Sequence, residues 1–140
     1  MKIGARLAAI GMPFALAACM TTPQIDEPGA AAFNPIAPPA QIFASAEAVR
    51  AHYLRDIEGR FVEEGSDAVE IDSALLSDPR IREHRILLIT TSGYPDDSVS
   101  GEQWRIAIVE DANGARVLDA GTRYNCARGA NPGWSRDLCP

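Results

Sequence analysis

Three cysteines are the residues of this chain whose side chains offer the plainest chemistry. Cys19 stands near the N-terminus, whereas Cys126 and Cys139 stand close together at the far end of the 140 residues. A thiol can carry a covalent acyl group, and two thiols in an oxidising compartment tend to pair as a disulfide. With three cysteines one thiol is left over, so the residues around Cys19 decide which chemistry applies.

The residues before Cys19 have the pattern of an export signal. Lys2 and Arg6 provide a short positive region, and an apolar run follows from Leu7 to Ala18. A stable membrane-spanning helix takes about 20 apolar residues, so this run is too short to be one. A short apolar core behind positive charge is typical of a cleaved export signal. An ordinary signal cut after Ala15-Leu16-Ala17 also fits, and it would leave Cys19 as an unpaired thiol.

The sequence Leu16-Ala17-Ala18-Cys19 resembles the lipobox of bacterial lipoproteins. In that family a diacylglycerol is attached to the cysteine thiol and a peptidase cuts directly before the cysteine. The resemblance therefore implies that Cys19 is the lipidated first residue of the mature protein. It covers residues 1–19 only, and the remainder is similar to uncharacterised small proteobacterial lipoproteins. With Cys19 acylated, Cys126 and Cys139 remain as an even pair that favours a disulfide in an exported protein.

These features predict a location in the bacterial cell envelope. Met20 follows the cysteine where an Asp would signal inner-membrane retention in enteric-type sorting, so we expect an outer-membrane lipoprotein facing the periplasm. The chain has 19 acidic and 13 basic residues and a net charge of −6. Nucleic acid and anionic lipid both bind basic surfaces, so neither is an expected partner of the folded domain. Membrane association is expected through the lipid on Cys19, because two or three acyl chains anchor stably.

The segment after Cys19 is rich in proline and alanine. Proline lacks an amide donor and keeps the preceding residue out of helical conformations, so we expect a tether over residues 19–41, after a signal peptide over 1–18. The alternative is that Phe33 and Ile36 dock on the domain. The globular domain is expected over residues 42–140. The prolines of the tether are Pro23, Pro28, Pro35, Pro38 and Pro39.

One main helix is expected from about residue 45 to residue 63. Ser45 is a suitable N-cap, and Gly65 is the expected end. An apolar residue recurs every fourth position, which indicates one buried stripe. The following segment, residues 66–79, is ambiguous between helix and strand. The apolar stripe consists of Val49, Tyr53, Ile57 and Phe61.

Three strands are expected in the C-terminal half, at residues 84–92, 102–110 and about 115–126. The first is apolar on both faces, as in a central strand, and the second alternates. Between the last two, Asp111-Ala112-Asn113-Gly114 predicts a hairpin turn.

The register of this hairpin follows from its loop. A three-residue loop over Ala112–Gly114 places Ile108 opposite Leu118. It also places Ile106 opposite Ala120, so that apolar side chains face each other.

Together these elements predict an α+β fold, in which one main helix packs on a three-stranded antiparallel meander. A Cys126–Cys139 disulfide would close the C-terminal loop and would stabilise it by about 3 kcal/mol through loop-closure entropy. Trp134 lies inside this loop and is expected to fold back over the sheet edge.

Few residues have the spacing of a metal or catalytic site. Asp96, Asp97 and Glu102 in one loop could collect a hard cation, but they do not match an EF-hand, so a solvated connection is expected. His52 and His84 have no second histidine at metal-ligand spacing. No nucleophile elbow or phosphate loop is present in the sequence. We therefore expect no metal, no cofactor, no catalytic residue and no enzymatic activity.

The function expected from the sequence is that of an envelope-anchored lipoprotein with a small structural or protein-interaction domain. Its expected partner is another envelope protein. The alternative is a periplasmic inhibitor or a small-ligand or glycan-binding module. Trp104 and Trp134 could stack on glycan, although core packing is expected for both. The stretch Tyr124-Asn125-Cys126 resembles periplasmic lysozyme-inhibitor lipoproteins, whose basic target would suit an acidic surface.

Overall fold

The computed structural model describes residues 27–64, 68–78, 81–130 and 132–140. The expected signal peptide, Cys19, Met20 and the expected helix end at Gly65 lie outside the described residues. The predictions for them therefore stay predictions.

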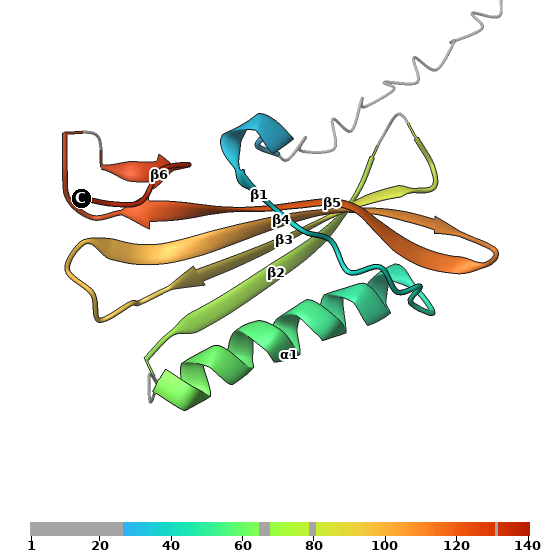
Figure 1. The fold of residues 1–140 in the computed structure, drawn as a ribbon, viewed down its shortest axis with the longest axis horizontal. Coiled ribbons are helices and arrows are strands. Elements are labelled where there is room, and N and C mark those ends of the chain that lie inside the picture. Colours follow the sequence, from blue (N-terminus) through green and yellow to red (C-terminus); the bar gives the residue numbers. More distant parts are fainter. Residues whose placement is uncertain (1–26, 65–67, 79–80, 131) are drawn as a thin grey trace, which may run out of the picture.

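The described chain forms one antiparallel sheet of six strands with a single long helix on one face (Figure 1). The strand order is β1-β5-β4-β3-β2, and β6 also pairs with β5. The elements, in chain order, are a short 3-10 helix η1 at Ala30–Ala32, β1 at Asn34–Ile36, α1 at Ala46–Glu64, β2 at Glu70–Ser77, β3 at His84–Ser92, β4 at Val99–Asp111, β5 at Gly114–Cys126 and β6 at Gly133–Ser135.

The predicted α+β fold with a three-stranded meander is wrong, because β1, β2 and β6 extend the sheet to six strands and the fold is β-rich, with one long helix. The three expected strands are present as β3, β4 and β5 in consecutive antiparallel pairs. The first of them has the predicted bounds, 84–92. The strands that were missed are either very short, as β1 and β6 are, or lie in the segment that was ambiguous.

The ambiguous segment forms strand β2, which pairs with β3 along its whole length. Its side chains alternate, so that Ile71 and Leu75 pack against the core while Glu70 and Asp72 are exposed. The spacing of the apolar residues in this segment also fits a helix. Only a strand, however, offers backbone N–H and C=O groups that can pair with those along the edge of β3.

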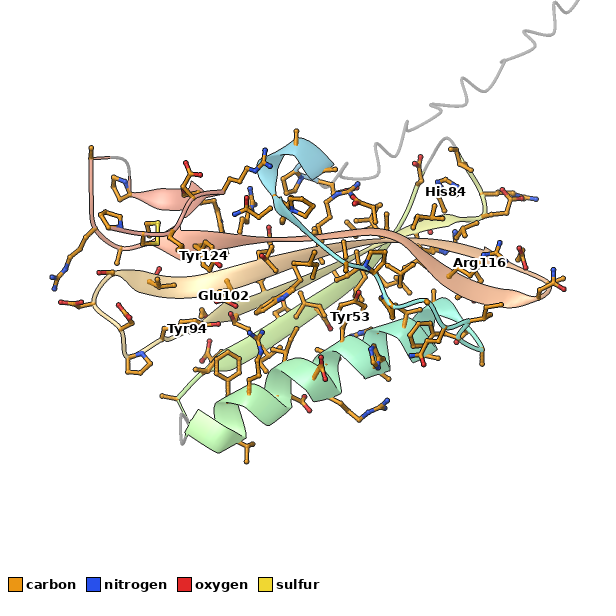
Figure 2. All side chains as sticks on the ribbon, viewed as in Figure 1. Tyr53, His84, Tyr94, Glu102, Arg116 and Tyr124 are labelled. Carbon is orange, nitrogen blue, oxygen red and sulfur yellow. A yellow bond between two sulfur atoms is a disulfide. The ribbon has the colours of Figure 1, made fainter. Side chains whose placement is uncertain are left out.

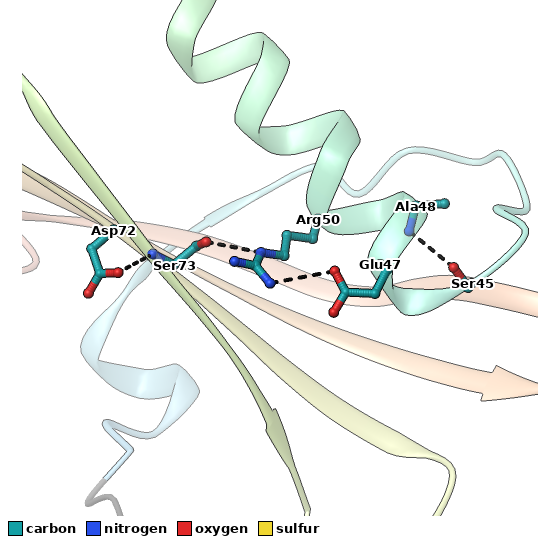
Figure 3. Close-up of polar contacts among 6 residues, drawn as sticks. All are labelled: Ser45, Glu47, Ala48, Arg50, Asp72 and Ser73. Carbon is teal, nitrogen blue, oxygen red and sulfur yellow. Dashed lines mark hydrogen bonds and ion pairs between the residues drawn. The ribbon is translucent and has the colours of Figure 1, made fainter.

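The predicted start and apolar stripe of α1 are confirmed. The Ser45 hydroxyl accepts a hydrogen bond of 3.2 Å from the Ala48 N–H, which is N-capping geometry (Figure 3). Glu110 of β4 accepts a further bond, of 3.1 Å, from the Ala46 N–H. In the same region Arg50 of α1 donates to the Ser73 hydroxyl of β2 at 3.0 Å. The helix start is therefore tied to both β4 and β2.

The core lies between α1 and the sheet. Each large apolar side chain buried there contributes about 1.5–3 kcal/mol to stability. Val49 and Ile57 from the predicted stripe are buried, and Tyr53 and Phe61 pack against the same cluster. The sheet contributes Leu87, Ile89, Trp104, Ile106, Ile108, Ala115, Val117 and Ala120.

The register of the hairpin between β4 and β5 differs from the predicted register in one detail. Ile106 lies opposite Ala120 as predicted, but Ile108 lies opposite Val117 and not Leu118. A β-bulge between these pairs makes up the difference, and the turn has one residue fewer than predicted. The bulge turns Val117 into the core, with 8% of its surface exposed, and leaves Leu118 half exposed.

The N-terminal segment is docked on the domain, which was the alternative to a tether throughout 19–41. β1 pairs with β5, and Phe33 is buried with only 3% of its surface exposed. Gly121 permits this approach, because a Cβ there would lie 2.8 Å from the Phe33 Cβ. The folded part of the chain therefore begins well before the expected boundary at residue 42.

The predicted disulfide between Cys126 and Cys139 is present and closes the C-terminal loop. Within this loop β6 pairs with the end of β5, and Trp134 lies opposite Asn125. The expectation that Trp134 folds back over the sheet edge is confirmed.

Candidate functional site

A groove of about 400 Å³ lies between α1 and the sheet. Its lining is a mixture of aromatic, charged and apolar side chains, as in sites that bind small molecules or side chains of a partner. Figure 2 shows Glu102 and Tyr124 at the same end of the sheet, with Tyr94 close by. The lining residues are Ile36, Tyr53, Asp56, Ile57, Arg60, Glu102, Trp104, Thr122 and Tyr124.

The spacing of the lining residues follows from the elements that carry them. On α1 they fall at helical intervals, so that Tyr53, Asp56 and Arg60 lie on one side of the helix. On the sheet, Glu102 is paired with Tyr124, and Trp104 with Thr122. Alternation along both strands turns these four side chains toward the helix. The groove is thus built on rigid elements and not on loops.

Arg60 lies across the groove from α1 to β4. Its guanidinium carbon is 5.1 Å from the centre of the Trp104 ring, and its Nη2 is 3.8 Å from Oε2 of Glu102. Half of the Arg60 side chain is exposed (51%), whereas Glu102 is 20% exposed. An exposed cation–π contact contributes about 0.5–1 kcal/mol, and an exposed ion pair at most about 1 kcal/mol. Arg60 is therefore held only weakly.

Hydrogen bonds with Thr91 and Tyr94 hold Glu102 in place. The buried Thr91 hydroxyl accepts a bond of 3.0 Å from the Glu102 N–H and donates one of 2.9 Å to the Tyr94 hydroxyl. The Tyr94 hydroxyl is in turn hydrogen-bonded to the Glu102 side chain. The Tyr94 ring packs edge-on against Phe61 of α1, with ring centres 5.4 Å apart. The Glu102 carboxylate therefore has a defined position at the groove.

Tyr94 and Tyr53, which lie at or near the groove, are weaker acids than usual. Burial raises the pKa of Tyr94 to about 12; the hydrogen bond from Thr91 opposes this rise, and the negative charge of Glu102 adds to it. Burial also raises the pKa of Tyr53, with a contribution from the charge of Asp56. Both phenols stay protonated near neutral pH and can donate hydrogen bonds. A tyrosine with so high a pKa is poorly suited to be a general base.

The lining carries groups that can recognise a ligand. Among these residues of the described chain there is no serine, cysteine or histidine that could pair as nucleophile and base. Two carboxylates, Asp56 and Glu102, stand beside the aromatic rings of Tyr53, Trp104 and Tyr124. Such a set can hold a ligand by stacking, hydrogen bonding and charge.

The acidic loop considered from the sequence does not form one cation site. Asp96 caps the loop by accepting bonds from the backbone N–H groups of Ser98 (2.6 Å) and Val99, which lower its pKa. Asp97 pairs with Arg128 at 2.7 Å, and Glu102 belongs to the groove. In the described residues no group of three or more His, Cys, Asp or Glu side chains could hold a metal ion.

The two histidines are not brought together. His52 lies on α1, with its ring 5.3 Å from that of Phe43. His84 begins β3 and lies at the other end of the sheet from Glu102, as Figure 2 shows. Neither lines the groove.

The two tryptophans have different environments. Trp104 is in the core, 4% exposed, as expected, whereas Trp134 is 40% exposed. The Arg123 guanidinium lies between the rings of Trp134 and Phe33, 4.8 and 4.9 Å from their centres. Burial lowers the pKa of Arg123. This sandwich, on the sheet face away from α1, joins the N-terminal segment to the C-terminal loop.

Arg60 and Thr122 are groove residues that the sequence did not indicate. Arg60, like Asp56, lies beside the predicted apolar stripe, where charged residues usually face solvent. The four-residue spacing of Asp56 and Arg60 indicates that they share one side of α1. Only the packing of α1 against the sheet shows that this side lines a groove.

Comparison with models of protein families, with curated proteins and with solved structures finds no match to this chain. Within the residues that the structure describes, no helix has the length and apolar character that crossing a bilayer requires.

Proposed function

We propose that this protein is an exported, lipid-anchored binding domain, without enzymatic activity, whose groove receives part of another envelope protein. The binding role rests on the groove between α1 and the sheet, where polar and aromatic side chains converge from three elements. The lipobox pattern around Cys19 supports the anchor.

The lining favours binding over catalysis. Its carboxylates and phenols can position a ligand, but Tyr53 of the lining and the nearby Tyr94, with raised pKa values, are poor bases near neutral pH. The domain is also small, so a groove on rigid elements with one side open suits an inserted side chain or short segment better than a fully enclosed substrate.

Site-specific photo-crosslinking in intact cells tests the proposal. The photoreactive residue p-benzoylphenylalanine is placed at Tyr53 or at Tyr124 in the full, exported chain. A matched control carries it at Leu118, which is half exposed at the β-bulge and does not line the groove. We expect an adduct of one discrete mass from both groove positions and none from Leu118.

Three other outcomes would contradict the proposal. Equal adducts from Leu118 would place the contact outside the groove. An adduct of twice the protein's own mass would indicate self-association. A small added mass without a protein adduct would favour the alternative, a small-ligand or glycan-binding module, which the aromatic lining at Tyr53 and Tyr124 also suits.

A further inference from the structure

The groove walls are complementary to a cation with an apolar stem. The lining combines the aromatic side chains of Tyr53, Trp104 and Tyr124 with two carboxylates. A cation gains from an aromatic face and from a carboxylate at the same time. An anion would meet the charges of Asp56 and Glu102, with only Arg60 of the lining residues to attract it.

The chain itself shows how a guanidinium fits there. The Arg60 guanidinium stands over the Trp104 ring at 5.1 Å and beside Glu102 at 3.8 Å. Trp104 itself is buried, with 4% of its surface exposed. Arg60 therefore occupies the position in which an incoming cation would find both its aromatic and its acidic contacts.

Arg60 is held loosely enough to be displaced. Its distance to Glu102 is longer than a hydrogen bond, and half of the side chain is exposed. Arg105, on the other face of the sheet, provides the contrast: its Nε is hydrogen-bonded to Glu27 at 2.7 Å and its side chain is 14% exposed. Arg105 is fixed, whereas Arg60 is a weakly bound occupant.

The surrounding charge favours a basic partner. The chain has a net charge of −6. The Asp56 carboxylate, which lines the groove, is exposed on α1. A net negative charge attracts an oppositely charged partner and increases its association rate.

From these observations we infer that the groove binds an arginine side chain from a basic segment of the partner protein, which displaces Arg60 from Trp104 and Glu102. This inference rests on the proposed function and adds the chemistry of the partner. Arg60 is then an internal competitor and not a ligand-binding residue.

Tryptophan fluorescence of the full, exported chain tests the inference. A Trp134→Phe variant leaves Trp104 as the single tryptophan, so its emission reports on the groove. The probe is acetyl-tetra-arginine amide, and the control peptide has citrulline, which is neutral and of the same shape, at each position. We expect saturable binding of the arginine peptide and at least about tenfold weaker binding of the citrulline peptide, because citrulline carries no charge for the ring or the carboxylate.

The direction of the Arg60→Ala effect is the sharpest part of the test. Removing the competitor should strengthen binding of the arginine peptide by about threefold to tenfold, since the contacts that Arg60 makes are each worth at most about a factor of five. The matched control is Arg55→Ala, which removes the same charge from the same helix outside the groove. It should strengthen binding far less. Glu102→Gln should weaken binding, and Asp56→Asn is the substitute if that variant does not fold.

A failure of this inference can be distinguished from a failure of the proposed function. Weaker peptide binding in Arg60→Ala, equal binding of the citrulline peptide, or no change of Trp104 emission would each overturn the inference. If crosslinks from Tyr53 and Tyr124 persist in that case, the proposed function stands with a different partner chemistry. If the crosslinks are absent, the proposed function itself fails.

Discussion

Single glycines show how closely the backbones are packed around the site. At Gly101 of β4 a Cβ would lie 2.1 Å from the Thr91 carbonyl oxygen, which only glycine allows. Thr91 is the residue that hydrogen-bonds the next position, Glu102. In contrast, a Cβ at Gly59 of α1 meets nothing within 4 Å. Two glycines near the groove therefore have opposite consequences when replaced.

We predict that Gly101→Ala lowers the free energy of unfolding by at least about 1–3 kcal/mol, because the backbones of β3 and β4 must separate. Gly59→Ala should instead raise it by about 0.5–1 kcal/mol, since alanine favours a helix interior. Urea unfolding of both variants beside the unaltered protein measures the difference. Equal effects would show that the close contact at Gly101 is not a constraint.

The raised pKa of Tyr94 predicts a loss of stability at high pH. The unfolded chain releases this proton near the ordinary value of 10.0, while the folded chain keeps it up to about 12. Above pH 10 the unfolded state therefore binds fewer protons, so the stabilisation present below pH 10 is lost as the pH rises to about 12. Tyr53 contributes with the same sign. Urea unfolding across this range should show a shallower decline in Tyr94→Phe; an unchanged decline would assign the effect to other groups.

The elements protect the two edges of the sheet in different ways. The outer edge of β5 is covered by Phe43 at Ala115, by β1 and by β6. At the opposite edge β2 has no neighbouring strand among the described residues. There the Ser73 N–H is hydrogen-bonded to the Asp72 side chain, which is itself exposed and charged. Charged side chains along an edge discourage pairing with another chain.

The disulfide and β6 form one unit, so the loss of one should release the other. We predict that Cys139→Ser lowers stability by about 3 kcal/mol through loop-closure entropy. It should also free Trp134 from Arg123, which a red shift of Trp134 emission in a Trp104→Phe background would report. In the unaltered protein isolated from cells, thiol labelling under denaturing conditions without reductant should find neither Cys126 nor Cys139 free. Labelling of both would mean that the bond does not form in the cell.

Elements with a long periodic pattern could be predicted from the sequence, and those defined by distant partners could not. The stripe from Val49 to Phe61 was enough to place α1, and the apolar run at 84–92 was enough to place β3. β1 and β6 have three residues each and exist because β5 offers an edge. The groove depends on the meeting of Arg60 with Trp104 and Glu102, which are more than forty positions away, so spacing along the chain could not indicate it.

At the scale of the whole molecule, membrane attachment and folding are expected to be separable. We predict that Cys19→Ser abolishes association with the membrane and leaves the domain folded, because the core and strand β1 lie farther along the chain than the predicted lipid site. Membrane fractionation with circular dichroism of the released protein measures both. A serine variant that stays in the membrane fraction would refute the lipid anchor.

The position of β1 has a mechanical consequence. β1 lies within the segment predicted as a tether, residues 19–41, and it is joined to β5 by three residue pairs, Asn34 with Thr122 to Ile36 with Ala120. Tension that a lipid anchor transmits along the chain would therefore load β4, through Glu27 and Arg105, and then β5 before it reaches α1. Ile36 and Thr122 also line the groove. A pull toward the membrane would act directly on two of its walls, so how firmly a partner is gripped would depend on how far that partner stands from the bilayer.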